Sequence, residues 1–587
     1  MKKRLLLLSL MVVMGNLSMG ENFKEGTYLG SANGYKGEIK VEVKLSKDKI
    51  EDVKVISNTD TPIISEAPVN IIPKKVLQTQ GLGVDVVAGA TGTSRGVIAA
   101  INNAIKSSGY KTDLRRVKET KEKFSDKVVE HRDDVVVIGA GGAGLIAAIE
   151  AKLNGANVSV IEKMAFPGGN TLISGAEYAA PENWVQKKEG LKDSKDQFFN
   201  DTMKGGDNES NPNLVKVLAD NALDGAVWLK DYVNVVFEDR QMFFGGHSVK
   251  RSLVPNGASG VEVIGKLMAK AKELGIPVYL EMNAVELITD GNRVVGVKAL
   301  TPTETHNFMG KNGVIIASGG FGSNIEMRKK HDPRMDEKIL STNTTGITGD
   351  GIVMGEKVGA ATTDMEFIQT YPVCDPENGA LLYTGDVRLA GSAILVNKEG
   401  KRFVEELDRR DVISFAITKQ TGGVGYLFWD QAQLDKTEVA VHHKGEYEAL
   451  LRRGILVKAD TIDDAAKHFG IDAKELKSTV EKYNEYAKNG KDLEFNKRGG
   501  LVAFTEGPYY ILKNTPAIHH TMGGLVIDTK GRVLDKNGNP IEGLFAAGEV
   551  TGDIHGKNRL GSNAITDITV FGKISGENAA KNLQKVN

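Results

Sequence analysis

The chain has 587 residues, of which 41% are hydrophobic and 26% charged, and its formal net charge is −1. Such a length indicates three or four domains of a soluble globular protein, and the balanced charge excludes a basic surface for nucleic acid or anionic lipid. The single cysteine, Cys374, excludes intrachain disulfides, haem attachment through paired cysteines and iron–sulfur ligation; no metal site is predicted, so another cofactor must carry any electrons.

The N-terminus has the pattern of an export signal. Basic residues at positions 2–4 precede an apolar run, Leu5–Met14, and small residues at 18 and 20 suit cleavage before Glu21. The run is too short for a stable bilayer anchor. We expect a signal peptide over residues 1–20 and a periplasmic or otherwise extracytoplasmic protein; the alternative is a buried N-terminal helix.

Residues 22–110 are expected to form a small α+β domain. Gly37–Leu45 and Ile50–Ser57 alternate like the strands of a hairpin, and Gly96–Ser107 has helical periodicity. A charged stretch follows in which both signs alternate. This pattern is typical of a solvated helix or linker, here assigned to residues 111–130.

A dinucleotide-binding unit is predicted from Asp134 onward. The strand Val135–Ile138 leads into the glycine turn at residues 139–144, then a helix, then the strand Val158–Ile161, which ends at Glu162. The glycines let backbone N–H groups approach a pyrophosphate at the helix N-terminus, and the carboxylate can accept bonds from ribose hydroxyls.

Further glycine segments favour FAD over NAD. A second glycine pair stands at 168–169, the strand Gly313–Ala317 ends in two more glycines, and the segment 543–549 is a strand that runs into a glycine turn. The predicted contacts to non-covalent FAD are Gly139, Gly141, Ala143, Gly144, Glu162, Lys163, Gly169, Asn170, Thr171, Gly319, Gly320, Asp350, Gly548, Glu549, Asn563, Ala564 and Ile565.

The segment Asp85–Ser94, with the sequence DVVAGATGTS, resembles the flavinylation site of FMN-binding domains. The resemblance implies a flavin transferase that joins the FMN phosphate to Thr91. Small residues leave room for the ring and give backbone donors for the phosphate. The alternative interpretation is an ordinary Gly/Thr turn before a helix.

From about Asp134 to its end, the chain resembles the flavoprotein fumarate reductase family, especially its soluble periplasmic flavocytochromes. The resemblance is carried by segments at residues 135–144, 168–171, 202–206, 341–343, 349–351, 393–403, 519–524, 548–551 and 555–561. It implies an α/β fold in which a Rossmann-like FAD-binding domain is interrupted by a mobile α+β capping domain. The expected boundaries are 131–365 and 519–587 for the FAD-binding domain and 366–518 for the capping domain.

The same resemblance places catalytic groups. His519 and Arg559 match the pair that grips the substrate carboxylate near the flavin, and Arg410 matches the arginine that protonates the substrate carbon. Arg388 matches an arginine of the family's proton-supply path. The sequence leaves open whether His520 or Arg409 takes these places, and whether Arg410 is a surface salt-bridge residue.

The chain departs from the family where a second substrate carboxylate would bind. Tyr371 stands where fumarate reductases carry histidine, and Gly385 where they carry glutamate, with Asp386 beside it. An aspartate repels a carboxylate but attracts an N–H or a cationic ring. The substrate should therefore carry one carboxylate and a far end that donates hydrogen bonds. Urocanate fits, and Tyr371, Asp386 and Glu177 look like the substrate-reading set of urocanate reductases.

The expected reaction is a two-electron reduction of the urocanate C=C bond to imidazole propionate. FAD N5 would give the hydride and Arg410 the proton, while covalent FMN relays electrons from a membrane or exported cytochrome-type donor. Three alternatives stay open: reduction of fumarate, acrylate, methacrylate or cinnamate; a flavin electron-transfer protein; and dehydrogenation of the saturated acid.

Overall fold

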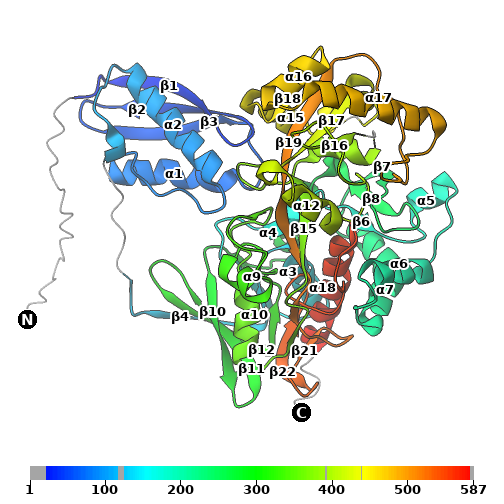
Figure 1. Cartoon of the computed structure of the whole chain (residues 1–587). Helices are drawn as coiled ribbons and strands as arrows, with labels where there is room; N and C mark the ends of the chain where they lie inside the picture. The colour runs from blue at the N-terminus through cyan, green and yellow to red at the C-terminus, as the bar shows by residue number, and fades with distance from the viewer. Residues whose placement is uncertain (1–21, 117–123, 391–392, 438, 582–587) are drawn as a thin grey trace, which may run out of the picture. The chain divides into compact units, whose positions relative to one another are not determined.

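The computed structural model describes residues 22–116, 124–390, 393–437 and 439–581 (Figure 1). The chain forms two compact units, one of residues 22–61 and 65–116 and one of residues 62–64 and 124–581. The predicted signal peptide lies outside the described residues, as does the middle of the predicted linker, residues 117–123. None of the described helices has both the length and the apolar composition needed to cross a bilayer.

The first unit is a three-stranded antiparallel sheet with two helices, β1 (Gly26–Asn33), β2 (Glu38–Leu45), β3 (Ile50–Asn58), α1 (Glu66–Thr79) and α2 (Thr91–Ser107). In β2 every second residue is buried, as the alternation predicted. The helix α2 begins five residues earlier than expected, at Thr91. It packs closely on β1 because Gly30 has no side chain: a Cβ there would lie 2.2 Å from the Ala100 carbonyl oxygen.

The second unit is built on an eight-stranded sheet whose central strands are parallel. Along the sheet the order is β10, β11, β12, β4, β5 and β9, and β22 pairs with both β12 and β21. The bounds are β4 (Val128–Ile138), β5 (Val158–Ile161), β9 (Val278–Tyr279), β10 (Asn283–Asp290), β11 (Arg293–Leu300), β12 (Thr305–Ile316), β21 (Arg532–Leu534) and β22 (Pro540–Ala546). The predicted linker therefore ends earlier than expected, because β4 already begins at Val128.

The predicted strand, glycine turn and helix are confirmed at the centre of this sheet. The last four residues of β4 are buried, and α3 (Gly142–Leu153) follows directly after the turn. The long C-terminal helix α18 (Asn563–Lys581) packs against α3 (Figure 1). The two helices approach closely at Gly576, where a Cβ would lie 2.3 Å from the Ala147 carbonyl oxygen.

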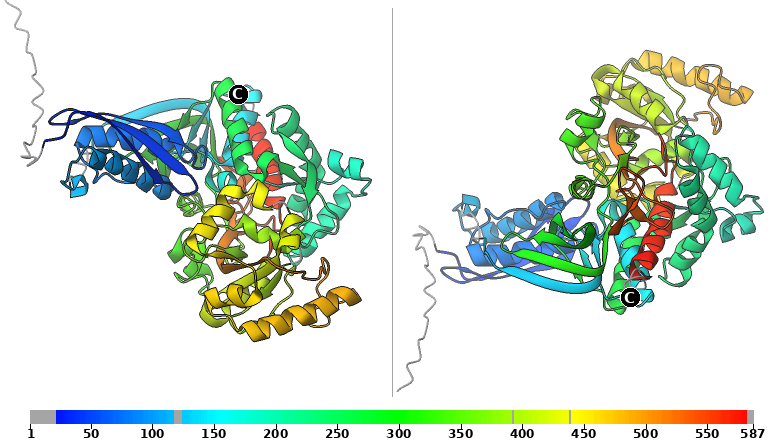
Figure 2. Two further views of the ribbon diagram at one scale, coloured as in Figure 1. Left: turned by 90° about the horizontal axis from the view of Figure 1, so that it is seen from above. Right: turned by 90° about the horizontal axis from the view of Figure 1, so that it is seen from below.

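The predicted capping region contains a six-stranded sheet of β13 (Leu340–Ser341), β15 (Ile368–Cys374), β16 (Ile394–Val396), β17 (Gly425–Asp430), β18 (Leu456–Ala459) and β19 (Tyr509–Thr521). One hydrophobic cluster includes Leu395 and Leu427, and the other includes their neighbours Ile394 and Phe428. Because successive strand residues point to opposite faces, the sheet has a core on each side. Figures 1 and 2 show α16 (Ile462–Phe469) and α17 (Ala473–Asn489) on the side away from α18.

Residues 462–489 have a helical pattern but do not form one continuous helix. The chain forms two helices because Gly470, at φ +65°, caps the first in a left-handed conformation that glycine adopts at little cost.

Further helices and strands connect these sheets or pack beside them. They are α4 (Gly169–Ile173), β6 (Tyr178–Ala179), α5 (Trp184–Glu189), α6 (Lys195–Gly205), α7 (Pro212–Asp231), β7 (Phe237–Met242), β8 (Ser252–Pro255), α8 (Gly260–Glu273), α9 (Ile325–His331), α10 (Asp350–Lys357), β14 (Thr362–Thr363), the 3-10 turn η3 (Tyr383–Asp386), α11 (Val387–Ala390), α12 (Arg410–Thr418), α13 (Gln431–Asp435), α14 (Val439–His442), α15 (Lys444–Arg453) and β20 (Gly524–Leu525).

The strand β19 crosses the boundary that the sequence predicted between residues 518 and 519. It pairs antiparallel with β15, with Gln369 opposite His520 and Tyr371 opposite Ala517. This ladder brings together segments that lie about 150 residues apart in the chain. It therefore places Tyr371, one of the two altered family positions, in the same part of the structure as the two histidines.

The segment between β14 and β15 contains a carboxyl group with an unusual pKa. Burial, together with the charge of Asp553, raises the pKa of Asp364 from 3.8 to about 6. Its carboxylate accepts a hydrogen bond from the Asp553 backbone N–H at 3.1 Å. Since the folded pKa is raised, the ionised form disfavours folding, and stability falls as the pH rises from about 4 through 6.

We expect Asp364→Asn to raise the melting temperature of the second unit by about 1–2 °C at pH 8 and to leave it unchanged at pH 4. The amide keeps an acceptor for the Asp553 N–H and removes the charge. Calorimetry at the two pH values measures the difference, with exposed Asp290→Asn as the control. A gain of equal size at both pH values contradicts the assignment.

Candidate active site

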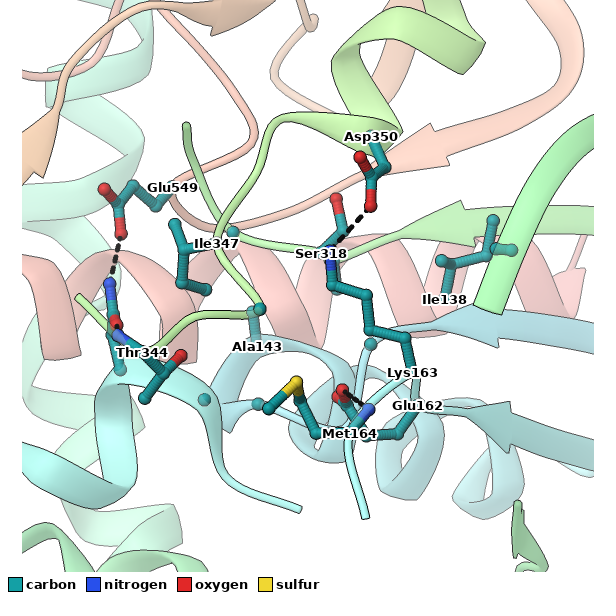
Figure 3. A pocket seen from close by; sticks show the side chains of 18 of the residues that line it. Ile138, Ala143, Glu162, Lys163, Met164, Ser318, Thr344, Ile347, Asp350 and Glu549 are labelled. Carbon is teal, nitrogen blue, oxygen red and sulfur yellow. Dashed lines mark hydrogen bonds and ion pairs between the residues drawn. The ribbon is translucent and has the colours of Figure 1, made fainter. Parts of the chain in front are cut away.

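A cavity of about 100 Å³ lies at the turn between β4 and α3 (Figure 3). Eleven of the predicted FAD contacts line it: Gly139, Gly141, Ala143, Glu162, Lys163, Gly169, Asn170, Thr171, Gly319, Asp350 and Glu549. A Cβ on Gly141 would meet only one atom, at 3.8 Å, so the turn leaves open space over the start of α3. This arrangement presents backbone N–H groups to an anion, as dinucleotide binding requires.

Glu162 is oriented by the backbone around it. Its carboxylate accepts hydrogen bonds from the N–H groups of Ala140 and Met164, both at 2.9 Å, and its burial raises its pKa. Figure 3 shows Lys163 extending to Asp350, whose carboxylate accepts its hydrogen bond at 2.6 Å. A carboxylate held by the backbone, Glu162, and a lysine, Lys163, therefore lie side by side at the end of β5.

The remaining predicted FAD residues lie elsewhere. Gly144, Gly320, Gly548 and Asn563 do not line the cavity. The three glycines serve packing, since a Cβ on Gly144 would lie 1.9 Å from the Gly139 carbonyl oxygen. Asn563 is buried and donates to the Thr202 hydroxyl. The sequence missed other lining residues, among them Met164, Ser318, Thr344, Ile347 and Ile568, because no motif marks them.

A second cavity, of about 150 Å³, adjoins the first. Both are lined by Asn170, Thr171, Glu549 and Ile568, so one extended ligand can pass from one to the other. Ala564 and Ile565, predicted as FAD contacts, line the second cavity. A glycine turn at one end and a neighbouring cavity at the other fit FAD, whose flavin would lie at the shared wall.

Part of the wall of the second cavity is basic. Arg410, the first residue of α12, and Arg559 line it. Each donates to the side-chain oxygen of buried Gln369, at 3.4 and 3.2 Å respectively. Burial lowers the pKa of both guanidinium groups, and the charge of Arg410 assists in lowering that of Arg559 to about 9. Two buried cations therefore face the cavity side by side, where an anion would stabilise both.

The structure distinguishes Arg410 from Arg409. Arg409 does not line the second cavity and instead forms ion pairs with Asp207 and Asp411. The histidines are not separated in this way, because both line the cavity. The Nδ1 of His519 lies 3.0 Å from the Thr342 hydroxyl. Burial and then nearby arginines lower the pKa of His519 well below its usual value, so the ring is neutral.

The wall of the same cavity also contains the acidic residues Glu177 and Asp386, together with Tyr371. The Tyr371 hydroxyl donates to Asp386 across 3.5 Å. Burial and the charge of Glu177 raise the pKa of Asp386 to about 7, and burial also raises the pKa of Glu177. Two carboxyl groups at a hydrogen-bonding tyrosine form a wall that accepts N–H groups.

Tyr371 contacts both the basic and the acidic residues of the cavity. Its ring centroid is 5.2 Å from that of His519, and the Arg410 guanidinium lies 4.9 Å from the ring. The sequence did not indicate several other lining residues of this cavity, among them Phe244, Thr342 and Tyr383. Gln369 was also missed, although it stands two residues before Tyr371 on the same face of β15.

Arg388 occupies a different position from the other predicted catalytic residues. It is buried outside the second cavity and donates to the Glu406 carbonyl oxygen. It lines a third, smaller cavity instead, which Arg410 also lines.

In the first unit, Thr91 is the first residue of α2 and is half-buried. Two residues on, the Thr93 hydroxyl donates to Asp60 at 2.8 Å, and Asp60 accepts hydrogen bonds from the N–H groups of Tyr35 and Lys36. The helix start is thus fixed beside the loop of Tyr35, whose side chain is 48% exposed. A phosphate at a helix N-terminus next to an exposed aromatic ring fits FMN.

Comparison with known proteins agrees with this geometry. Residues 134–565 match the family described as FAD binding domain, and residues 34–106 match the FMN-binding domain. The chain is 46% identical to a urocanate reductase of Eggerthella lenta, over 94% of this chain and 92% of that protein. It is 34% identical to an NADH:acrylate oxidoreductase of Vibrio harveyi over 95% of this chain, but spans only 61% of that protein.

A solved structure shows the same fold. The open conformation of a flavocytochrome c3 fumarate reductase is 36% identical and aligns with a TM-score of 0.68, over 81% of this chain and 84% of that one. The chain therefore belongs to the flavoprotein fumarate reductase family. It is a flavin-dependent oxidoreductase with one FAD-binding and one FMN-binding domain.

We expect Glu162→Gln to weaken FAD binding by roughly 10- to 100-fold, because an amide cannot accept bonds from both backbone N–H groups and a ribose hydroxyl. Titration of the FAD-free protein with FAD, followed by flavin fluorescence, measures the change. The matched control is Glu286→Gln, an exposed position on β10. Equal affinity in the variant and the wild type contradicts the assigned contact.

Proposed function

We propose that this enzyme reduces the C=C bond of urocanate, giving imidazole propionate. The observation that carries the proposal is the mixed charge of one cavity, whose wall holds both the cations Arg410 and Arg559 and the carboxyl groups of Asp386 and Glu177. A substrate with one carboxylate and an N–H-bearing ring has a partner for each kind of group. A dicarboxylate would place its second carboxylate against the acidic wall.

Binding would orient the substrate from both ends. Arg559 and His519 would hold the carboxylate, since a guanidinium forms paired hydrogen bonds to a carboxylate and a neutral imidazole can donate one. Asp386 and Glu177 would accept the ring N–H groups, and the Tyr371 ring would pack beside the imidazole. Sequence similarity to a urocanate reductase supports this assignment.

FAD, when bound, supplies the hydride that reduces the β-carbon. Arg410 would protonate the α-carbon, and its lowered pKa makes it a stronger acid than an exposed arginine. Arg559 would stabilise the negative charge that develops on the carboxylate side as the double bond is reduced. Buried guanidinium groups act strongly there because the cavity walls exclude most water.

The accessory features belong to the same proposal. FMN would be esterified to Thr91 by a flavin transferase and would relay electrons from a membrane or exported cytochrome-type donor. The basic, apolar and small residues at positions 2–20 support export, and so a periplasmic or other extracytoplasmic location. Covalent attachment would keep FMN on the enzyme outside the cytoplasm.

An assay of α,β-unsaturated acids with reduced viologen tests the substrate. We expect Asp386→Ala to lower kcat/KM for urocanate by about 100-fold, because a buried ring N–H loses its hydrogen-bond acceptor. Acrylate, which does not reach the acidic wall, should change less than threefold. The exposed substitution Asp463→Ala is the control. Equal losses for the two acids, or faster turnover of fumarate than of urocanate by the wild type, would refute the proposal.

We expect Thr91→Ala to abolish covalent FMN while FAD content stays unchanged. The protein is produced together with a flavin transferase, and flavin fluorescence of the denatured polypeptide detects the ester. Exposed Thr27→Ala on β1 is the control. Fluorescence that persists on the Thr91 variant would place the attachment elsewhere.

A further inference from the structure

A third cavity, of about 40 Å³, lies against the second cavity, where the substrate is proposed to bind and which is called the substrate cavity below. Tyr371, Arg410, Arg559 and Phe244 line both, so these side chains form the wall between them. Arg410 therefore has the substrate on one side and a separate small chamber on the other. We call this space the arginine chamber, because Arg388, Arg409, Arg410 and Arg559 all line it.

The chamber is large and polar enough for two or three water molecules, since one water needs roughly 10–15 Å³ and two to four polar partners. Two of its buried guanidinium groups offer such partners. The Nε atoms of Arg388 and Arg559 have no hydrogen-bond partner among the described residues. An unpaired buried N–H is costly, and a water molecule would satisfy it.

Fumarate reductases carry a glutamate at the position of Gly385. In this chain, position 385 therefore offers no side-chain acid that could give a proton to Arg410. Gly385 is buried in η3, and a Cβ there would lie 2.4 Å from the Val373 Cγ1 atom. The Nη1 of Arg388, three residues later, donates to a backbone carbonyl oxygen. Proton supply to Arg410 must therefore follow another course than a glutamate at position 385.

The chamber leads toward the surface at Asp408. The side chain of Asp408 is 30% exposed and that of its neighbour Arg409 is 33% exposed, and both line the chamber. Asp408 accepts hydrogen bonds from the Arg409 backbone N–H and from Arg498. Its carboxylate can therefore hold water at the outer end, opposite Arg410.

We propose that water in the arginine chamber returns the proton to Arg410 between turnovers, entering at Asp408. This rests on the proposed role of Arg410 as the acid. In each turnover, an Arg410 N–H bond breaks and a C–H bond forms at the α-carbon, which leaves a neutral guanidine. A hydrogen-bonded chain of water then gives one proton to that nitrogen. This is one of the two protons that the net two-electron reduction takes from solvent; the other is taken up when the hydride donor is re-formed.

Gly245 offers a way to fill the chamber without changing a charged residue. It lines the chamber, and a Cβ there would meet only the Leu407 carbonyl oxygen, at an ordinary 3.6 Å. Gly245→Leu would displace water from the chamber. The matched control is Gly265→Leu on α8, where a Cβ meets nothing within 4 Å.

The experiment compares single and repeated turnover in the holoenzyme. For single turnover, the flavins are reduced in advance and mixed with urocanate, so that the proton already on Arg410 is used. For repeated turnover, reduced viologen feeds the enzyme continuously. In Gly245→Leu we expect single turnover within twofold of the wild type, a steady-state rate at least tenfold lower, and a larger rate decrease in D₂O. Asp408→Asn should lower the steady-state rate in the same selective way.

An unchanged steady-state rate in both variants would overturn the proposal. If Gly245→Leu also lowers the single-turnover rate, the test depends on Asp408→Asn alone. A loss confined to the steady-state rate of Asp408→Asn would then support proton supply through the chamber, and an unchanged steady-state rate would refute it. A selective loss in Asp386→Asn but in neither chamber variant would assign the proton supply to Asp386 instead. If the wild type itself does not oxidise its flavins with urocanate, the proposed function fails, and that result is distinct from these.

Discussion

The pairing of β15 with β19 is the constraint on which the site depends. Its register sets Gln369 opposite His520 and leaves Tyr371 on the same face as Gln369, two residues further along β15. Gln369 then bonds both arginines through one oxygen, while its amide nitrogen donates to Asn558 and to the Arg559 carbonyl oxygen. A slip of one residue would turn Gln369 and Tyr371 to the opposite face and separate the two guanidinium groups from their shared acceptor.

The same pairing allows like charges to be buried together. Arg410 and Arg559 repel each other, and each loses hydration on burial. The carboxylates of Glu177 and Glu549 act in the opposite direction on Arg559. The opposite charges in the cavity wall offset each other only in part. A bound anion would stabilise the two arginines, and a bound hydrogen-bond donor would satisfy the two carboxyl groups. Affinity for a substrate of mixed character follows from this electrostatic arrangement, in addition to the shape of the cavity.

Much of the FAD site could be predicted from the sequence, because its informative residues lie close together in the chain. The turn at 139–144 and the acid at 162 have a fixed spacing along a strand, a helix and a strand, so their meeting at one cavity follows from the order of elements. Phe244, Thr342 and Tyr383 could not be assigned to the cavity, since each belongs to a different segment and only the folded chain brings these segments together. Tertiary packing also separated Arg410 from Arg409: adjacent in sequence, they diverge where α12 begins.

Specificity and proton supply are linked through the two adjacent residues Gly385 and Asp386. Gly385 packs against Val373 with no space for a side chain, whereas Asp386 lines the substrate cavity. An acid at position 386 thus contributes to the substrate wall, which a glutamate at 385 would not do from its buried position. If Arg410 is the acid, as proposed, it would take its proton from its other side. The arginine chamber lies there, and its contact with Asp408 gives that side a route to solvent. Recognition of a nitrogen-bearing ring and a water-based proton supply would then have a common structural origin in η3.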